Sequence, residues 1–334
     1  MNSKMKKGIF LGVMVLLLIT LTACDSGSDS NSDIVYHYNG SYDEGDFISI
    51  DLNLSKNRLS YHNRITGEKG SSDFTKLSNG MYSMGPDLFL TLDDQVLIAT
   101  NEDGDEGEQI LTTLKEVNSP YGDEILGKYN IITSLEGARG TVDIKTDSKL
   151  DIAFENSSLR DLPDLDYSFK DEYKAIEIIE EGPDGSFRHY GVFLDGKIGV
   201  FDSYWKETPE SDWQGDGMSI LVREDSSIDL EDFVGEYSFI DVDADSGSFE
   251  LKYVDQDSLE LFISAEGRTV ALDNIVLDKG MASFEAGIVD PALAESWSMM
   301  LVPGDEKIIV LGSEDDHTFG GDEGGLLIGI GQDN

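Results

Sequence analysis

An internal repeat constrains the fold more than any other feature of the sequence. Residues 123–129 and 231–237 share one pattern: two acidic residues, two apolar residues, Gly, a charged residue and Tyr. A fainter copy, Gly40-Ser41-Tyr42, stands near the start of the chain. Self-similarity of this kind is typical of tandem structural units that each contain the same elements.

A second marker closes each unit. Runs of glycine and acidic residues at 104–107, 215–217 and 321–324 each precede an apolar segment, and these segments begin near Ile110, Ile220 and Leu326. The two markers keep nearly constant spacing, which predicts three consecutive units. We therefore divide the chain into a signal peptide (1–23), a flexible tether (24–33) and β-units at 34–118, 119–227 and 228–334.

Apolar residues recur at every second position within the units. Ile48, Ile50, Leu52 and Leu54 alternate with polar residues, as strands do when one face is buried and the other is wet. Turn signals between such segments indicate about eight short strands per unit. The sequence therefore predicts an all-β chain of three antiparallel barrels or sandwiches. Helix is expected only as single turns, one at 291–297 and others before Gly127 and Gly235.

The opening motif resembles that of lipocalin-type (calycin) barrels. Those barrels begin with Gly-x-Trp, and here Tyr129 follows Gly127 and Tyr237 follows Gly235 at the same spacing. The resemblance covers about seven residues in each unit and implies an eight-stranded up-and-down barrel with its sheet edges closed.

The charge balance excludes several partners. The chain has 67 acidic and 24 basic residues, a formal net charge of −43. Such a chain repels polyanions, so we expect no nucleic-acid partner and no attraction to anionic membrane surfaces. The alternatives are an interaction with cations or basic partners, or a simple solvated acidic surface. The single cysteine excludes an intrachain disulfide, so packed cores must supply the stability.

The N-terminus resembles a bacterial lipoprotein signal. A lysine-containing start precedes an apolar run at residues 9–21, and Leu21-Thr22-Ala23-Cys24 matches the Leu-x-[Ala/Gly]-Cys box. The resemblance implies a diacylglycerol on the Cys24 sulfur, cleavage before Cys24 and acylation, by palmitate for example, of the new amino end. It places the protein in the cell envelope as a lipid-anchored, extracytoplasmic protein on the periplasmic face or the cell surface, with its membrane contact through Cys24.

Catalytic signatures are absent from the sequence. The four histidines (His37, His62, His189 and His317) have no metal-binding spacing, and no nucleophile or phosphate-binding motif occurs. A lone histidine on a strand is typical of a packing or surface residue. We predict that the protein is not an enzyme. An enzyme acting on cell-envelope polymers is the alternative that two convergent carboxylates in a cleft would favour.

Two acidic turns are candidate calcium sites. Each places oxygen-bearing side chains at alternate positions before a glycine, and Ca²⁺ prefers six to eight oxygen ligands. Neither matches an EF-hand, and ordinary acidic hairpin turns are the alternative interpretation. The candidate ligands are Asn101, Asp103 and Asp105 in one turn, and Asp241, Asp243 and Asp245 in the other.

Three aromatic residues are candidates for a binding loop. Tyr204, Trp205 and Trp213 flank an acidic stretch that the sequence places in a long loop, where exposed rings could contact a protein or glycan partner. Packing of these rings on their own barrel is the alternative.

The sequence as a whole favours a non-catalytic binding or structural lipoprotein that meets a partner through its loops. A carrier with an apolar ligand inside one barrel is the first alternative. It requires an unfilled interior, whereas inward-pointing phenylalanines predict filled barrels (Phe154, Phe193, Phe249 and Phe262).

Overall fold

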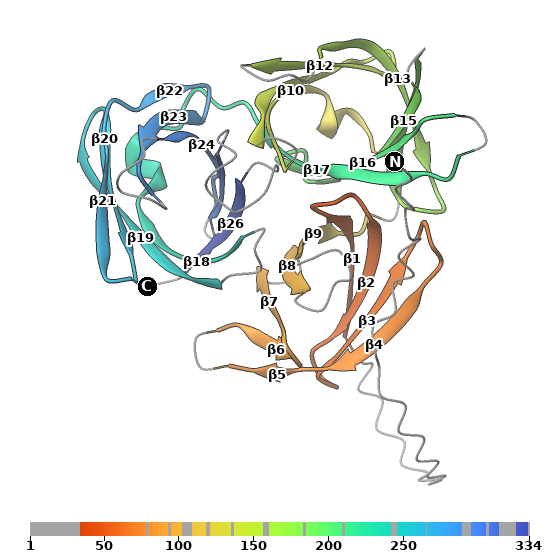
Figure 1. The fold of residues 1–334 in the computed structure, drawn as a ribbon, viewed down its shortest axis with the longest axis horizontal. Coiled ribbons are helices and arrows are strands. Elements are labelled where there is room, and N and C mark those ends of the chain that lie inside the picture. The colour runs from red at the N-terminus through yellow and green to blue at the C-terminus, as the bar shows by residue number, and fades with distance from the viewer. Residues whose placement is uncertain are drawn as a thin grey trace, which may run out of the picture.

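The protein folds into three β-sheets of eight or nine antiparallel strands (Figure 1). The computed structural model describes residues 34–77, 80–92, 95–101, 109–117, 121–134, 137–155, 160–182, 185–208, 211–241, 246–264, 266–288, 295–304, 307–313 and 325–332. This arrangement confirms the predicted all-β class, with barrels or half-barrels as the units. Cys24 lies outside the described residues. Within them, no helix is long and apolar enough to cross a membrane.

The first sheet has nine strands in the order β4-β3-β2-β1-β9-β8-β7-β6-β5. Its strands are β1 (Val35–Tyr42), β2 (Phe47–Asn53), β3 (Arg58–Asn63), β4 (Lys69–Asp73), β5 (Thr75–Lys76), β6 (Tyr82–Met84), β7 (Asp87–Leu92), β8 (Val96–Asn101) and β9 (Gln109–Lys115).

The middle sheet is a closed eight-stranded barrel in which β10 pairs with β17. Its strands are β10 (Gly127–Thr133), β11 (Arg139–Ile144), β12 (Lys149–Glu155), β13 (Leu162–Lys170), β14 (Ala175–Gly182), β15 (Gly185–Leu194), β16 (Ile198–Lys206) and β17 (Gln214–Arg223). The 3-10 turn η1 (Asp123–Ile125) precedes it.

The third sheet repeats the order of the first, β21-β20-β19-β18-β26-β25-β24-β23-β22. Its strands are β18 (Gly235–Asp241), β19 (Ser246–Asp255), β20 (Ser258–Ile263), β21 (Arg268–Leu272), β22 (Val276–Asp278), β23 (Met281–Ala286), β24 (Glu295–Val302), β25 (Ile308–Ser313) and β26 (Gly325–Gly331). The 3-10 turn η3 (Leu230–Phe233) precedes it and has a capping box formed by Asp229 and Asp232.

One tyrosine occupies the same place in every sheet. Tyr38, Tyr129 and Tyr237 are fully buried on the first strand and lie opposite the last residue of the closing strand (Lys115, Arg223 and Gly331). The Tyr129 hydroxyl donates to the Ile125 carbonyl at 2.9 Å, and the Tyr237 hydroxyl donates to the Phe233 carbonyl at 2.8 Å. The prediction that Gly40-Ser41-Tyr42 is the first copy was therefore wrong by four positions, because Tyr38 and not Tyr42 has this register.

The fourth strand of each sheet changes partner halfway along its length. In the middle barrel β13 is continuous, and its first half pairs with β12 and its second half with β14. In the outer sheets the chain breaks at the corresponding point, between β4 and β5 and between β21 and β22. The residues at the changeover, Phe74, Tyr167 and Ile275, each donate a backbone N–H to the turn between the second and third strands. This shared hydrogen bond confirms that the three units have a common plan.

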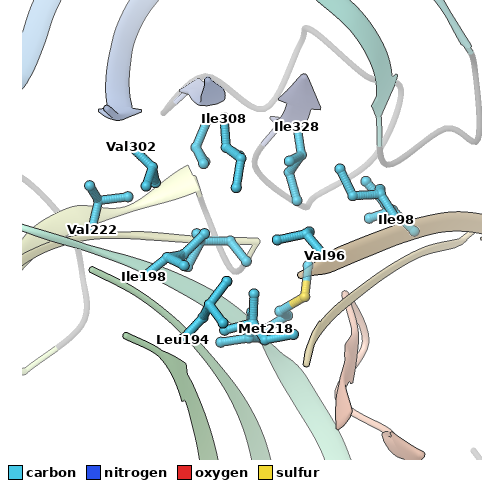
Figure 2. Packing of buried hydrophobic residues seen from close by; sticks show 14 of the residues in the cluster. Val96, Ile98, Leu194, Ile198, Met218, Val222, Val302, Ile308 and Ile328 are labelled. Carbon is cyan, nitrogen blue, oxygen red and sulfur yellow. The ribbon is translucent and has the colours of Figure 1, made fainter. Parts of the chain in front are cut away.

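The closing strands pack together in a core that all three sheets share. Figure 2 shows part of this core, to which β8, β16, β17, β25 and β26 contribute side chains from the outer faces of the sheets. Every residue of β25 is buried, and so is almost every residue of β9. The expectation of one wet face was therefore wrong for these strands, whose outer faces replace water with apolar contact.

The predicted helical turns were partly correct. η1 and η3 lie before Gly127 and Gly235, as expected. Glu295 to Trp297, in contrast, belong to β24, where Trp297 pairs with Phe284 on one side and Ser313 on the other. Pairing on both sides and burial outweigh a local helix-start signal. Residues 289–294 lie outside the described residues.

Candidate functional site: a cavity in the middle barrel

The inner face of the middle barrel changes from apolar to polar along its axis. At the η1 end, the inward positions hold Tyr129, Phe193 and Leu221, which are buried in an apolar cluster. Because alternate residues of a strand share a face, the same strands present Thr133, His189 and Ser219 inward at the other end. Pairing places Thr133 opposite Ser219 and His189 opposite Ser203.

A cavity of about 140 Å³ occupies the polar end. Its wall combines apolar and aromatic side chains with a small number of polar groups, a composition typical of small-molecule sites. The apolar wall consists of Ile131, Ile152, Phe154, Leu162, Phe187 and Phe201, and the polar groups belong to Thr133, Arg160, Glu180, His189, Ser203, Asp216 and Ser219. The prediction that inward-pointing phenylalanines fill every barrel was therefore wrong here, since Phe154 lines a space instead of filling it. Phe262, which the same prediction placed inward, lies on the opposite face of β20 from the buried Leu259 and Leu261.

His189 places an unpaired polar atom in the cavity wall. Its Nδ1 lies 2.8 Å from the Ser203 hydroxyl oxygen, whereas its buried Nε2 has no hydrogen-bond partner among the residues that the structure describes. Burial lowers the pKa of His189 to about 4, so the imidazole is neutral at pH 7. A buried polar atom without a partner costs about 1–3 kcal/mol, which a ligand that hydrogen-bonds to it recovers.

Glu180 supplies a carboxylate at the mouth. Its Oε1 forms an ion pair with Arg160, whose side chain is 63% exposed while that of Glu180 is only 14% exposed. Its buried Oε2 has no hydrogen-bond partner within the described part of the chain. The ion pair compensates the carboxylate from the solvent side and leaves one oxygen available as an acceptor.

The first sheet contributes to the surroundings of the mouth. The turn between β1 and β2 lies against β16 and β17, and an added Cβ on Gly45 (φ +90°) would lie 2.4 Å from the Ser203 carbonyl oxygen. An added Cβ on Gly215 would lie 2.1 Å from the Glu44 carbonyl oxygen. Glycine is required at this contact because the two backbones leave no room for a side chain. Burial also raises the pKa of the cavity residue Asp216.

The three candidate aromatic residues do not form one exposed loop. Tyr204 is buried on β16, and its hydroxyl accepts a hydrogen bond from the Phe47 backbone at 2.5 Å. Its assignment to an exposed loop was therefore wrong, because Tyr204 belongs to the paired part of β16 and shares the outer face of Ile198 and Val200, which packs in the core between the sheets. Trp213 is partly buried between Arg188 and Lys206, whose cationic groups lie 4.4 and 4.6 Å from its ring centre. Trp205 lies opposite Phe187 and so shares the face that lines the cavity.

The calcium prediction rests largely on residues outside the described ranges. Asp103, Asp105, Asp243 and Asp245 all fall there. Asn101 ends β8, and Asp241 ends β18 with a buried side chain. Among the described residues, no cluster of three or more His, Cys, Asp or Glu side chains could hold a metal ion. The calcium site stays a prediction.

Sequence reasoning missed His189 and Glu180 as site residues. A usable signal was present, because His189 shares the alternation of Phe187 and Phe193 on one strand and therefore points inward. Glu180 follows Ile176 and Ile178 at the same period. Polar residues at inward positions of a barrel mark a cavity or a cost in stability.

Comparison with known proteins yields only distant likenesses. No protein-family model matches the sequence, and no curated protein matches it significantly. A protein of unknown function from Nostoc punctiforme is 12% identical and covers 63% of this chain and 97% of its own, with a TM-score of 0.28. Transferrin binding protein B from Haemophilus parasuis is 8% identical, and the likeness covers 90% of this chain and 76% of that protein, with a TM-score of 0.28. The Neisseria meningitidis protein of that name is 12% identical, and the likeness covers 86% of this chain and 66% of that protein, with a TM-score of 0.26. None of these likenesses carries an argument about function.

Proposed function

We propose that the protein is a lipid-anchored extracytoplasmic binding protein whose middle barrel holds a small molecule. The observation that carries this proposal is the cavity of about 140 Å³ inside the closed barrel. The proposal takes up the first alternative from the sequence, a carrier with a ligand inside one barrel, and changes the kind of ligand. The ligand must satisfy polar groups as well as apolar walls, because His189 and Glu180 line the cavity and each has a side-chain polar atom without a partner in the described residues.

The rest of the proposal is supported by sequence. The lipobox that ends at Cys24 supports the lipid anchor and the cell-envelope location. A protein or glycan partner at the loops has less support, because Tyr204 is buried and Trp213 is held between two cations. A catalytic role has no support from the described carboxylates, since the cavity offers only Glu180, already paired with Arg160, and Asp216.

A cavity-filling substitution tests the proposal. Ser219 lines the cavity on β17, so Ser219→Leu places an apolar side chain in the space. Phenol is titrated into the wild-type protein and into the variant, and binding is followed by the chemical shifts of the backbone amides in NMR spectra. We expect shifts around the cavity in the wild type and a loss of binding of about tenfold or more in the variant.

The matched control is Ser168→Leu. It makes the same substitution at an exposed position of β13, so binding is expected to stay unchanged. Failure of phenol to shift any cavity residue of the wild type would contradict the proposal. So would equal binding by Ser219→Leu and the wild type.

A further inference from the structure

The size of the cavity limits the ligand to about one ring. Cavities of about 150 Å³ lined by aliphatic and aromatic side chains accommodate benzene. The present cavity has about 140 Å³, and three of its walls are the rings of Phe154, Phe187 and Phe201. A flat six-membered ring therefore fits the space, whereas a long acyl chain would extend out of it.

The charges around the cavity limit the ligand further. Glu180 and Asp216 are acidic, and the one basic side chain among the described lining residues, Arg160, is already paired with Glu180. His189 contributes a neutral imidazole. The protein as a whole has a formal net charge of −43, so a carboxylate or phosphate would be repelled on approach and would find no free cation in the described part of the lining.

The unpaired atoms specify the polar group of the ligand. Glu180 Oε2 is an acceptor, so the ligand must donate a hydrogen bond at this point. His189 Nε2 is a donor or an acceptor according to the direction of the Ser203 hydroxyl, and it tolerates either group on the ligand. The two residues lie diagonally across adjacent strands, because Glu180 is opposite Phe187 and His189 is opposite Ile178. They can therefore contact the same edge of one ring.

We propose that the middle barrel selects an uncharged or cationic ring compound that carries a hydroxyl or amino hydrogen-bond donor, and that it rejects carboxylates of the same size. This inference rests on the proposed function, since it names the ligand class of the same cavity. Selection against an anion follows from Glu180, whose second oxygen offers a hydrogen-bonding acceptor and no counter-charge.

A series of four ring probes tests the selection. Benzene, phenol, benzylammonium and benzoate are titrated by calorimetry into the wild type. We expect phenol and benzylammonium to bind about tenfold or more tightly than benzene, and benzoate to show no binding. Benzoate binding as tightly as benzylammonium would overturn the inference while leaving the barrel a binding site. Absence of binding by all four probes would overturn the proposed function together with the inference.

Substitution of the acceptor supplies a second readout. Glu180→Gln keeps the shape and removes the charge, so benzylammonium should lose about tenfold in affinity while phenol changes little. The matched control is Glu181→Gln, an exposed change at the next residue of β14, for which all affinities should stay at wild-type values. An equal loss in both variants, or no loss in Glu180→Gln, would contradict the role of Glu180.

Discussion

The third sheet curves into a half-barrel (Figure 1), called the third barrel, which shares the plan of the middle barrel and differs from it in what fills the interior. Both first strands carry the buried tyrosine, so positions in the two barrels correspond through strand pairing. The place of His189, opposite Ser203, is held by Trp297 opposite Ser313. The place of Ser219 on the closing strand is held by Leu327. His189 and Ser219 in the middle barrel thus stand where the third barrel has the large apolar residues Trp297 and Leu327. This difference explains why the cavity lies in the middle barrel.

The two barrels also differ in how the end near the 3-10 turn is closed. In the middle barrel Arg223 lies over the ring of Tyr129, 5.4 Å from its centre, and donates to the carbonyls of Glu124, Leu126 and Gly196. In the third barrel the corresponding residue is Gly331. Lys307, from the turn before β25, donates instead to the carbonyls of Asp232 and Val234. The turn leaves carbonyl groups without partners at this end, and a cation satisfies them in both cases, from β17 in the middle barrel and from the turn before β25 in the third.

The largest expected effect separates a filled barrel from an unfilled one. Trp297→Ala removes a ring that is 2% exposed from the third barrel and should cost about 3–5 kcal/mol of unfolding free energy. Phe154→Ala removes a ring that already borders a space in the middle barrel, so it should cost about half as much. Urea unfolding of both variants measures the difference. Equal losses would mean that the two interiors are packed equally well.

The second effect compares Arg223 and Lys307, the two cationic side chains that hydrogen-bond to the backbone carbonyls at the 3-10 turns. Arg223→Ala removes a ring contact and several hydrogen bonds to backbone carbonyls, and we expect a loss of about 3 kcal/mol. Lys307→Ala removes two such hydrogen bonds and should cost about 1–2 kcal/mol. Thermal and urea unfolding give both values. A larger loss of unfolding free energy for Lys307→Ala than for Arg223→Ala would contradict this ranking of the two residues.

The third effect is a pH dependence of the unfolding free energy that arises from His189 in the cavity wall. Burial lowers the pKa of His189 from 6.5 in the unfolded chain to about 4, so between these values the unfolded state binds more protons. Stability should therefore fall as the pH drops from 6.5 toward 4, by up to about 3 kcal/mol. His189→Gln should remove this part of the dependence in urea unfolding at pH 7 and pH 4.5. His62→Gln, on β3 of the first sheet, is the control and should leave most of it in place.

The smallest effect is a gain in stability. Ser219→Leu introduces into the middle barrel the residue that the third barrel has at Leu327, and filling the cavity should raise the unfolding free energy by about 1 kcal/mol. The same substitution is expected to weaken phenol binding by about tenfold or more. A gain in stability together with unchanged binding would show that the cavity and the binding site are different places.

The prediction from sequence was most successful where a local pattern repeats. Alternation at Ile48, Ile50 and Leu52 correctly identified a strand, and the glycine-tyrosine motif located the first strand of the middle and third barrels. It failed at the first copy because Tyr36-His37-Tyr38 lacks the glycine and Gly40-Ser41-Tyr42 imitates it nearby. It failed again at Trp297, where a helix-start signal stood next to a residue whose place is set by strand pairing.

The sequence by itself determined the class of fold and its number of units, because strand alternation and turn chemistry depend on neighbouring residues. Only the tertiary structure decided which barrel contains a cavity, because that depends on which inward side chains meet across strands far apart in the chain, such as Thr133 with Ser219. It also decided that the outer faces of β25 and β26 are buried, since three sheets share one apolar core there. Burial and cavity volume are properties of side chains from many segments together, and no single stretch of sequence carries them.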